Sequence, residues 1–155
     1  MKKIISALLI AAMMLSAACL ASGADEILIL GIPYTGESAP VSSSGYSALY
    51  MFGNGVINSQ NLSHDPEMTF EDYIAEKYPT YTKFEVFKTI AHDDITIECA
   101  QVDFTFGDDT FTILAAYATD DAFDYLMLID CAEEARPDIE ASMDEISLVA
   151  APPAQ

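Results

Sequence analysis

Four apolar runs dominate the second half of the chain, and short polar segments separate them. Runs of this length joined by short polar turns predict an antiparallel meander of four strands. Several runs are apolar at consecutive rather than alternate positions, which predicts a sheet buried on both faces. The runs span residues 84–91, 95–106, 110–118 and 123–131, with turns at 92–94, 107–109 and 119–122.

A strand and a hairpin are predicted before the meander. Residues 26–34 form a short apolar run that contains a proline near its end, as expected for a short buried strand. Two further strand-like segments, 48–52 and 55–60, flank Gly53-Asn54, a pair that favours turns with positive φ. Residues 35–47 are rich in Gly, Ser and Pro, which predicts a loop.

Two segments carry the three- and four-residue spacing of amphipathic helices. The first begins at Thr69, which forms a capping-box pattern with Asp72, and the second spans 136–146. The apolar stripes are Phe70, Tyr73, Ile74 and Tyr78 in the first helix and Ile139, Met143 and Ile146 in the second. The expected fold class is therefore α+β, an antiparallel β-sheet meander covered by helices on both faces, in an α/β/α sandwich.

The order of these elements resembles the PsbP/DcrB-like α/β/α sandwich, a family of photosystem accessory proteins and exported bacterial proteins, many of them lipoproteins. The segments that carry the resemblance are 69–78, 111–118, 125–130 and 137–148. The resemblance implies a non-enzymatic binding or accessory role, and it transfers no site residue. The chain departs from the family's pattern at the Ser-rich segment 36–47, where a compact turn containing Trp is expected.

The first 24 residues have the three-part layout of a secretory signal peptide. Two lysines precede an apolar segment of 12 residues, 4–15, which is shorter than an ordinary membrane span. Small residues then predict cleavage between Ala24 and Asp25, leaving a single domain over 25–149 and a flexible tail over 150–155. The alternative is lipid attachment at Cys19. Either form predicts bacterial-type export, to the cell envelope or the extracellular space.

The charge of the chain is strongly negative. It contains 25 acidic and 6 basic residues, and removal of the leader with its two lysines changes the formal charge from −19 to −21. Such a surface argues against binding nucleic acid or an anionic membrane through a basic patch. Because 52% of the residues are hydrophobic, we expect a packed core rather than disorder, and no membrane span in the mature form.

Catalytic motifs are not apparent. The two histidines, His64 and His92, are not part of an HExxH sequence, and the chain has no GxSxG, Walker or GxGxxG motif. We therefore expect a protein that is not an enzyme. The competing class is a small secreted hydrolase that acts on glycans through paired carboxylates, which would require two such groups about 5 to 10 Å apart in a concave pocket.

Acidic residues occupy the predicted turns of the meander. In a simple meander, the turns at 92–94 and 119–122 lie at the same end of the sheet, about 10 Å apart. Ca²⁺ prefers carboxylate oxygens, so a calcium-dependent surface module is a further alternative. The other interpretation is that these residues are solvated turns that keep the chain soluble. The candidate metal ligands are Asp93, Asp94, Asp120 and Asp121, with Asp124 as a further one.

The two cysteines of the mature domain are predicted to be unpaired. In the expected meander, Cys99 lies opposite about Tyr117, which lies opposite about Asp124. Cys131 is seven residues further along that strand, roughly 23 Å away at 3.3 Å per residue. A disulfide requires Cα atoms closer than about 7 Å.

The sequence thus predicts an exported, non-catalytic binding or accessory domain. Its partner would be a protein, a peptide or a component of the cell envelope. The best candidate for a contact surface is the loop 35–47 with Tyr34, Tyr46 and Tyr50 around it, because exposed aromatic residues are common at interfaces. No cofactor other than calcium is indicated.

Overall fold

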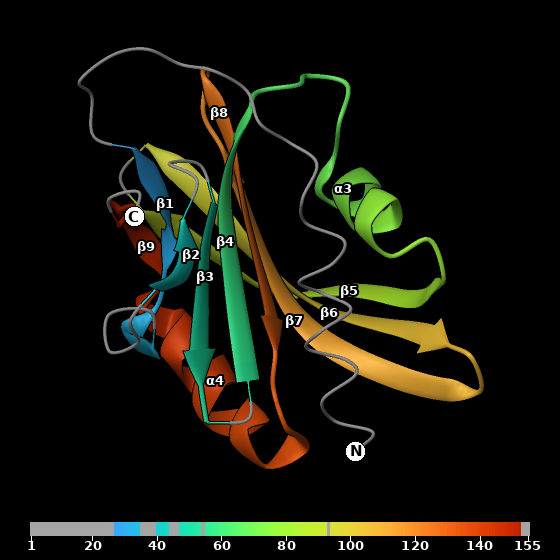
Figure 1. Cartoon of the computed structure of the whole chain (residues 1–155). Coiled ribbons are helices and arrows are strands. Elements are labelled where there is room, and N and C mark those ends of the chain that lie inside the picture. Colours follow the sequence, from blue (N-terminus) through green and yellow to red (C-terminus); the bar gives the residue numbers. More distant parts are fainter. Residues whose placement is uncertain (1–26, 35–39, 44–46, 54, 93, 153–155) are drawn as a thin grey trace.

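A curved antiparallel sheet forms the body of the protein (Figure 1). The structure is a computed structural model that describes residues 27–34, 40–43, 47–53, 55–92 and 94–152. Within these residues, seven strands pair in the order β2-β3-β4-β8-β7-β6-β5. They are β2 (Pro40–Ser43), β3 (Ser47–Phe52), β4 (Gly55–Ser63), β5 (Tyr81–His92), β6 (Ile95–Phe106), β7 (Asp109–Thr119) and β8 (Phe123–Asp130).

A two-stranded ribbon joins the two ends of the described chain. Strand β1 (Leu28–Gly31) pairs antiparallel with β9 (Ser147–Ala150), and the Ala151 N–H donates to the Ile27 carbonyl at 2.7 Å. Among the described residues, the helical elements include α3 (Phe70–Lys77), α4 (Arg136–Ser142) and two 3₁₀ turns, η1 (Glu133–Ala135) and η2 (Met143–Glu145), on either side of α4. Pro33 and Tyr34 are also helical, at the end of the segment predicted as a strand. In Figure 1, α3 and the ribbon lie on opposite sides of the sheet.

The local predictions for the hairpins and the first helix are confirmed. The four strands β5 to β8 pair successively and antiparallel, and β3 pairs with β4 through a turn in which Gly53 has a φ of 48°. Helix α3 begins after Thr69, whose hydroxyl accepts from the Asp72 N–H while the Asp72 carboxylate accepts from the Thr69 N–H. This reciprocal cap satisfies two N–H groups that have no partner within the helix.

Each face of the sheet has its own hydrophobic core, which explains the apolar runs at consecutive positions. Along β8, Met127 and Ile129 belong to the core beneath the ribbon and α4, whereas Leu126 and Leu128 belong to the core beneath α3. Successive side chains of a strand point to opposite faces, so a strand buried on both faces needs apolar residues at every position.

The predicted α+β fold class, an α/β/α sandwich with helices covering both faces, is wrong. The structure is mostly antiparallel strand, and α3 and α4 have only eight and seven residues. One face is covered by the β1–β9 ribbon together with α4. The sequence pattern shows that both faces are buried, but it does not show whether helices or strands cover them.

Two other segments differ from expectation. Strand β2 lies within residues 35–47, which were predicted as loop, and it pairs with β3 across an irregularity between Pro40 and Ser42. Helix α4 ends at Ser142, and a 3₁₀ turn follows where the sequence predicted one continuous helix. The apolar stripe nevertheless functions as predicted, since Ile139, Met143 and Ile146 are all buried.

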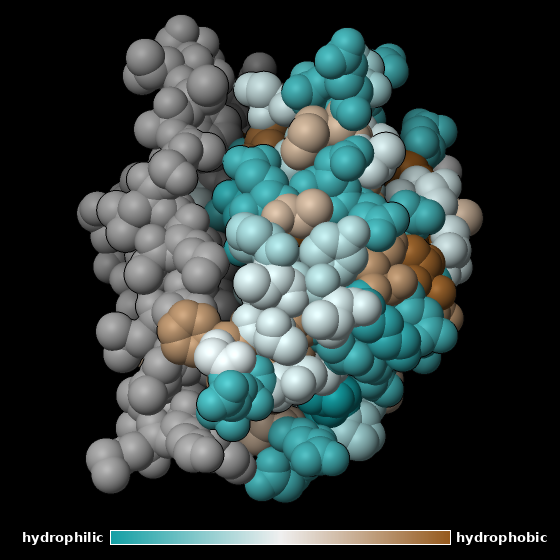
Figure 2. Space-filling model, turned by 90° about the vertical axis from the view of Figure 1, so that its right-hand side faces the viewer, coloured by the Kyte–Doolittle hydropathy of each residue, from teal (hydrophilic) through white to brown (hydrophobic). Residues whose placement is uncertain are grey.

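Polar residues cover most of the described face shown in Figure 2, and hydrophobic residues occupy smaller areas between them. The exposed large hydrophobic side chains include Val86 and Phe87 on the edge strand β5. The leader 1–24 and Cys19 lie outside the described residues. Among the helices of the described residues, none has the length and apolar character needed to cross a membrane.

Candidate functional site

A buried carboxylate, Asp124, connects three separate parts of the fold. Its side chain is completely buried, near the start of β8. Oδ1 lies 2.9 Å from His64 Nδ1 and accepts from the Tyr117 hydroxyl at 3.1 Å. Oδ2 accepts from the Tyr73 hydroxyl at 2.7 Å and from the Asp65 N–H at 3.0 Å. We call Asp124 and these four partners the Asp124 cluster.

The order of the strands brings this cluster together. Strand β4 pairs with β8, so the segment that leaves β4 at His64 passes the start of β8, and the His64 N–H donates to the Ala122 carbonyl. Tyr73 comes from α3 and Tyr117 from β7, both on the same face of the sheet as Asp124. The cluster therefore fastens the connection between β4 and α3 to the sheet.

The electrostatics of the cluster favour an ion pair. Burial alone would raise the pKa of Asp124, but hydrogen bonds from His64, Thr119, Asp65 and Tyr73 lower it to about 2. The hydrogen bond to Asp124 raises the pKa of His64, against a smaller opposing effect of desolvation. Burial and Asp124 together raise the pKa of Tyr117 to about 12. A buried carboxylate with this many donors is stable as an anion.

The His64–Asp124 pair does not have the arrangement of a catalytic triad. In a triad, the carboxylate binds one ring nitrogen of the histidine and the nucleophile binds the other. Here the hydroxyl of Thr119 lies 3.1 Å from Nδ1, the same nitrogen that binds Asp124. Among the described residues, no Ser or Cys side chain is hydrogen-bonded to His64. The geometry is that of a structural ion pair.

The pair predicts a dependence of stability on pH. Because the pKa of His64 is raised in the folded protein, its protonation stabilises the fold fully below the ordinary pKa of 6.5. This contribution is lost as the pH rises through the raised pKa of His64. We expect the urea midpoint of unfolding to fall over that range, and His64→Gln to flatten the profile. His92→Gln is the control and should retain the fall; an unchanged profile in His64→Gln would contradict the assignment.

The acidic turns do not converge on a metal site in the described part of the chain, where no group of three or more His, Cys, Asp or Glu residues is placed to hold an ion. Asp120 is occupied instead, since its carboxylate accepts from the Ala122 and Phe123 N–H groups and from the Tyr125 hydroxyl at 2.7 Å. Asp94 and Asp121 are exposed, and Asp93 lies outside the described residues. Calcium binding stays a prediction.

Cys99 and Cys131 are both buried and free. Cys99 lies opposite Ala116, one residue from the expected register, and Tyr117 lies opposite Leu126 rather than near Asp124. The shift shortens the expected separation. Ala116 in turn pairs with Met127, and Cys131 lies four residues beyond Met127. Cys131 is therefore displaced by about 13 Å along the strand direction from the position in line with Cys99. Burial raises the pKa of the Cys99 thiol to about 11, as expected for an inert core residue.

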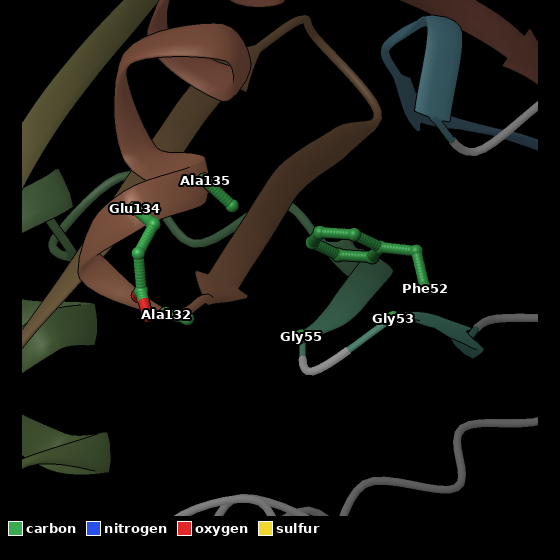
Figure 3. A pocket seen from close by; sticks show the side chains of 6 residues that line it. All are labelled: Phe52, Gly53, Gly55, Ala132, Glu134 and Ala135. Atoms are coloured by element: carbon green, nitrogen blue, oxygen red, sulfur yellow. The ribbon is translucent and has the colours of Figure 1, made fainter.

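A pocket opens between the β3–β4 turn and the start of α4. Its volume is about 250 Å³, and Figure 3 shows the Phe52 ring pointing from β3 toward Ala135. Residues on either side of the turn form one wall, and the segment after β8 forms the other. We call this the hairpin pocket; it is lined by Phe52, Gly53, Gly55, Ala132, Glu134 and Ala135.

Gly55 controls the position of the Phe52 ring. A Cβ at residue 55 would lie 2.5 Å from the ring tip and 3.0 Å from the Asp130 carbonyl oxygen. We expect Gly55→Ala to displace the ring and to cost about 1–3 kcal/mol of stability. Urea unfolding and the ring proton shifts of Phe52 would measure both effects. Gly53→Ala is the matched control, because its Cβ would meet nothing within 4 Å. We expect this variant to lose stability only through the strain of a positive φ, with the Phe52 ring in its wild-type position.

A second pocket lies beside the β1–β9 ribbon. It has a volume of about 360 Å³, and the predicted contact residue Tyr50 lines it, largely buried at 5% exposure. We call it the ribbon pocket; it is lined by the end of β1 and its following turn (Gly31, Ile32, Pro33), Tyr50, Glu145, and three residues of β9 (Ser147, Val149, Ala150).

The predicted contact residues lie close to both pockets. Tyr34 is half-buried, and its ring centroid lies 5.3 Å from that of Phe52 in the hairpin pocket. Tyr50 and Phe52 are two residues apart on β3 and therefore face the same side of the sheet, about 7 Å apart along the strand. Tyr46 lies outside the described residues. Tyr34 and Tyr50 thus both pack against the core beneath the ribbon, Tyr50 as a buried member of it, and their role as contact residues stays a prediction.

Comparison with known proteins assigns no family. No family model matches the chain, and no curated protein matches it in sequence. Among solved structures, the chain is similar to PA94 from Pseudomonas aeruginosa, described as a protein of unknown function and a candidate regulator. The similarity covers 87% of this chain and 90% of that one, with 12% identity and a TM-score of 0.43. The PsbP/DcrB-like resemblance stays a prediction.

Proposed function

We propose that this protein is an exported, non-catalytic binding or accessory domain that holds a protein or peptide partner on the surface formed by the two pockets. The observation that carries the proposal is the placement of the pockets. Strand β3 contributes Phe52 to the hairpin pocket and Tyr50 to the ribbon pocket, so both open along one strand. Concave surfaces lined by aromatic and small residues are typical binding sites.

The pockets do not favour the hydrolase alternative. Glu134 is the one carboxylate that lines the hairpin pocket in the described structure, and Glu145 is the one that lines the ribbon pocket. Acid–base cleavage of a glycosidic bond requires two carboxylates that face the same bond. Asp124, the most strongly perturbed carboxylate, is fully buried within its cluster and so has no access to a substrate.

Site-specific photo-crosslinking tests the binding surface. A photoreactive phenylalanine analogue would be placed at Glu134 and, separately, at Val149, and also at the control positions Asp108 and Asp121, which are exposed on turns away from the pockets. With irradiation in the native host, we expect a discrete crosslinked partner from the two pocket positions and none from the controls. No crosslink from either pocket position, or the same crosslinks from all four, would overturn the proposal.

The export part of the proposal has its own measurement. The intact mass of the protein isolated from the native host should correspond to a chain that begins at Asp25, or at a lipidated Cys19 in the anchored alternative. A mass that includes the leader would contradict export through a cleaved signal peptide. This measurement also reports on the thiols, because an internal disulfide would lower the mass by about two hydrogen atoms.

A further inference from the structure

Both pockets border an acidic segment of the chain. The segment 133–145, which contains η1, α4 and η2, has six acidic residues and one basic residue. Arg136, the basic residue, is half-buried, and its Nε atom is enclosed by the protein. The exposed acids of this segment are Glu133, Glu134, Asp138, Asp144 and Glu145.

This acidic segment contributes to both pockets. Glu134 lines the hairpin pocket and Glu145 lines the ribbon pocket, and α4 lies between them in the chain. Asp144 is paired with Lys88, so one of the exposed acids is already neutralised. We call Glu134 and Glu145 the acidic rims of the two pockets. Each pocket is also lined by an aromatic residue, Phe52 in the hairpin pocket and Tyr50 in the ribbon pocket.

We propose that the partner docks here through an extended cationic segment, in which Lys or Arg side chains contact the acidic rims and apolar side chains enter the two pockets. This inference rests on the proposed function. Successive side chains of an extended segment alternate in direction, so cationic side chains can contact Glu134 and Glu145 while apolar side chains face the pockets. Charge complementarity selects the partner, since an acidic segment would be repelled by a domain of charge −21.

Peptide titrations of the folded mature chain test the charge of the occupant. The probes are three decapeptides in which Leu alternates with Lys, Ser or Glu, followed by amide NMR spectra at low salt. We expect the Lys–Leu peptide to shift resonances around both pockets, the Ser–Leu peptide to bind at least tenfold more weakly, and the Glu–Leu peptide not to bind. Added salt should weaken the Lys–Leu complex.

Charge reversal at the rims provides the matched control. Glu134→Lys combined with Glu145→Lys should weaken Lys–Leu binding at least tenfold. Asp108→Lys combined with Asp121→Lys changes the net charge by the same amount on distant turns and should leave the affinity within about twofold. Equal losses in both double variants, or shifts away from the pockets, would show nonspecific attraction and overturn the inference.

The outcomes separate this inference from the proposed function. If the Ser–Leu peptide binds at the pockets as tightly as the Lys–Leu peptide, the surface binds peptides but charge does not select them, and only the inference fails. If no peptide binds and the crosslinks from Glu134 and Val149 are also absent, the proposed function fails with it. A thermal melt of each double variant checks that it remains folded.

Discussion

Replacement of Asp124 by Ala should lower the free energy of unfolding by about 3–5 kcal/mol, because several buried donors would lose their shared acceptor at once. The substitution removes the acceptor for the hydroxyls of Tyr73 and Tyr117, the Asp65 N–H and His64. The two hydroxyls are in the core beneath α3, where unpaired donors are costly. Urea unfolding followed by circular dichroism would measure the loss.

Two further variants complete this experiment. Asp124→Asn keeps the shape of the side chain and one acceptor oxygen, so a smaller loss of about 1–3 kcal/mol is expected, and it provides a measurable value if the Ala variant does not fold. Asp121→Ala, three residues away and exposed, should change stability by less than about 0.5 kcal/mol. A loss below about 1 kcal/mol for Asp124→Ala would show that the cluster does not hold α3 and its preceding segment in place.

Replacement of Ile139 by Ala should cost about 2–5 kcal/mol, as usual for a large-to-small change in a core. Ile139 is completely buried beneath α4. This helix has seven residues and no side-chain cap at its N-terminus, so packing rather than helix propensity must hold it on the sheet. Because the segments at its two ends contribute Glu134 and Glu145 to the pockets, the same variant should also weaken any ligand bound there.

The control for this variant is another large-to-small change on the same side of the sheet. Val149→Ala on β9 alters a residue that is 36% exposed, and it should cost less than about 1 kcal/mol. Unfolding curves of both variants would be compared with the wild-type curve. Equal losses at the two positions would show that α4 does not depend on its buried stripe.

Local structure was predictable from the sequence where one short segment contains all the information. The capping box of Thr69 and Asp72, the turn at Gly53 and the buried stripe of α4 are examples. The pairing of β1 with β9 was not predictable from the sequence. The two strands are more than 110 residues apart, and neither contains a signal for the other. Their pairing replaces the expected helix layer on that face, which is why the sandwich prediction was wrong.

The candidate site was predictable only in part. Tyr34 and Tyr50 follow from their position around a polar segment, but the pockets depend on the approach of α4 and β9. The sequence contains one signal for the Asp124 cluster, because a charged residue inside an otherwise apolar strand must have buried partners. His64, the partner 60 residues away, could be identified only from the pairing of β4 with β8.

The β1–β9 ribbon also determines when the fold can be completed. Leu28 pairs with Ala150, so β1, the first strand of the described domain, has no strand partner until β9 is available. Closing a loop of this length reduces the entropy of the chain, and the contacts that offset this loss form only when β1 and β9 meet. Topologies with contacts of such large sequence separation fold slowly.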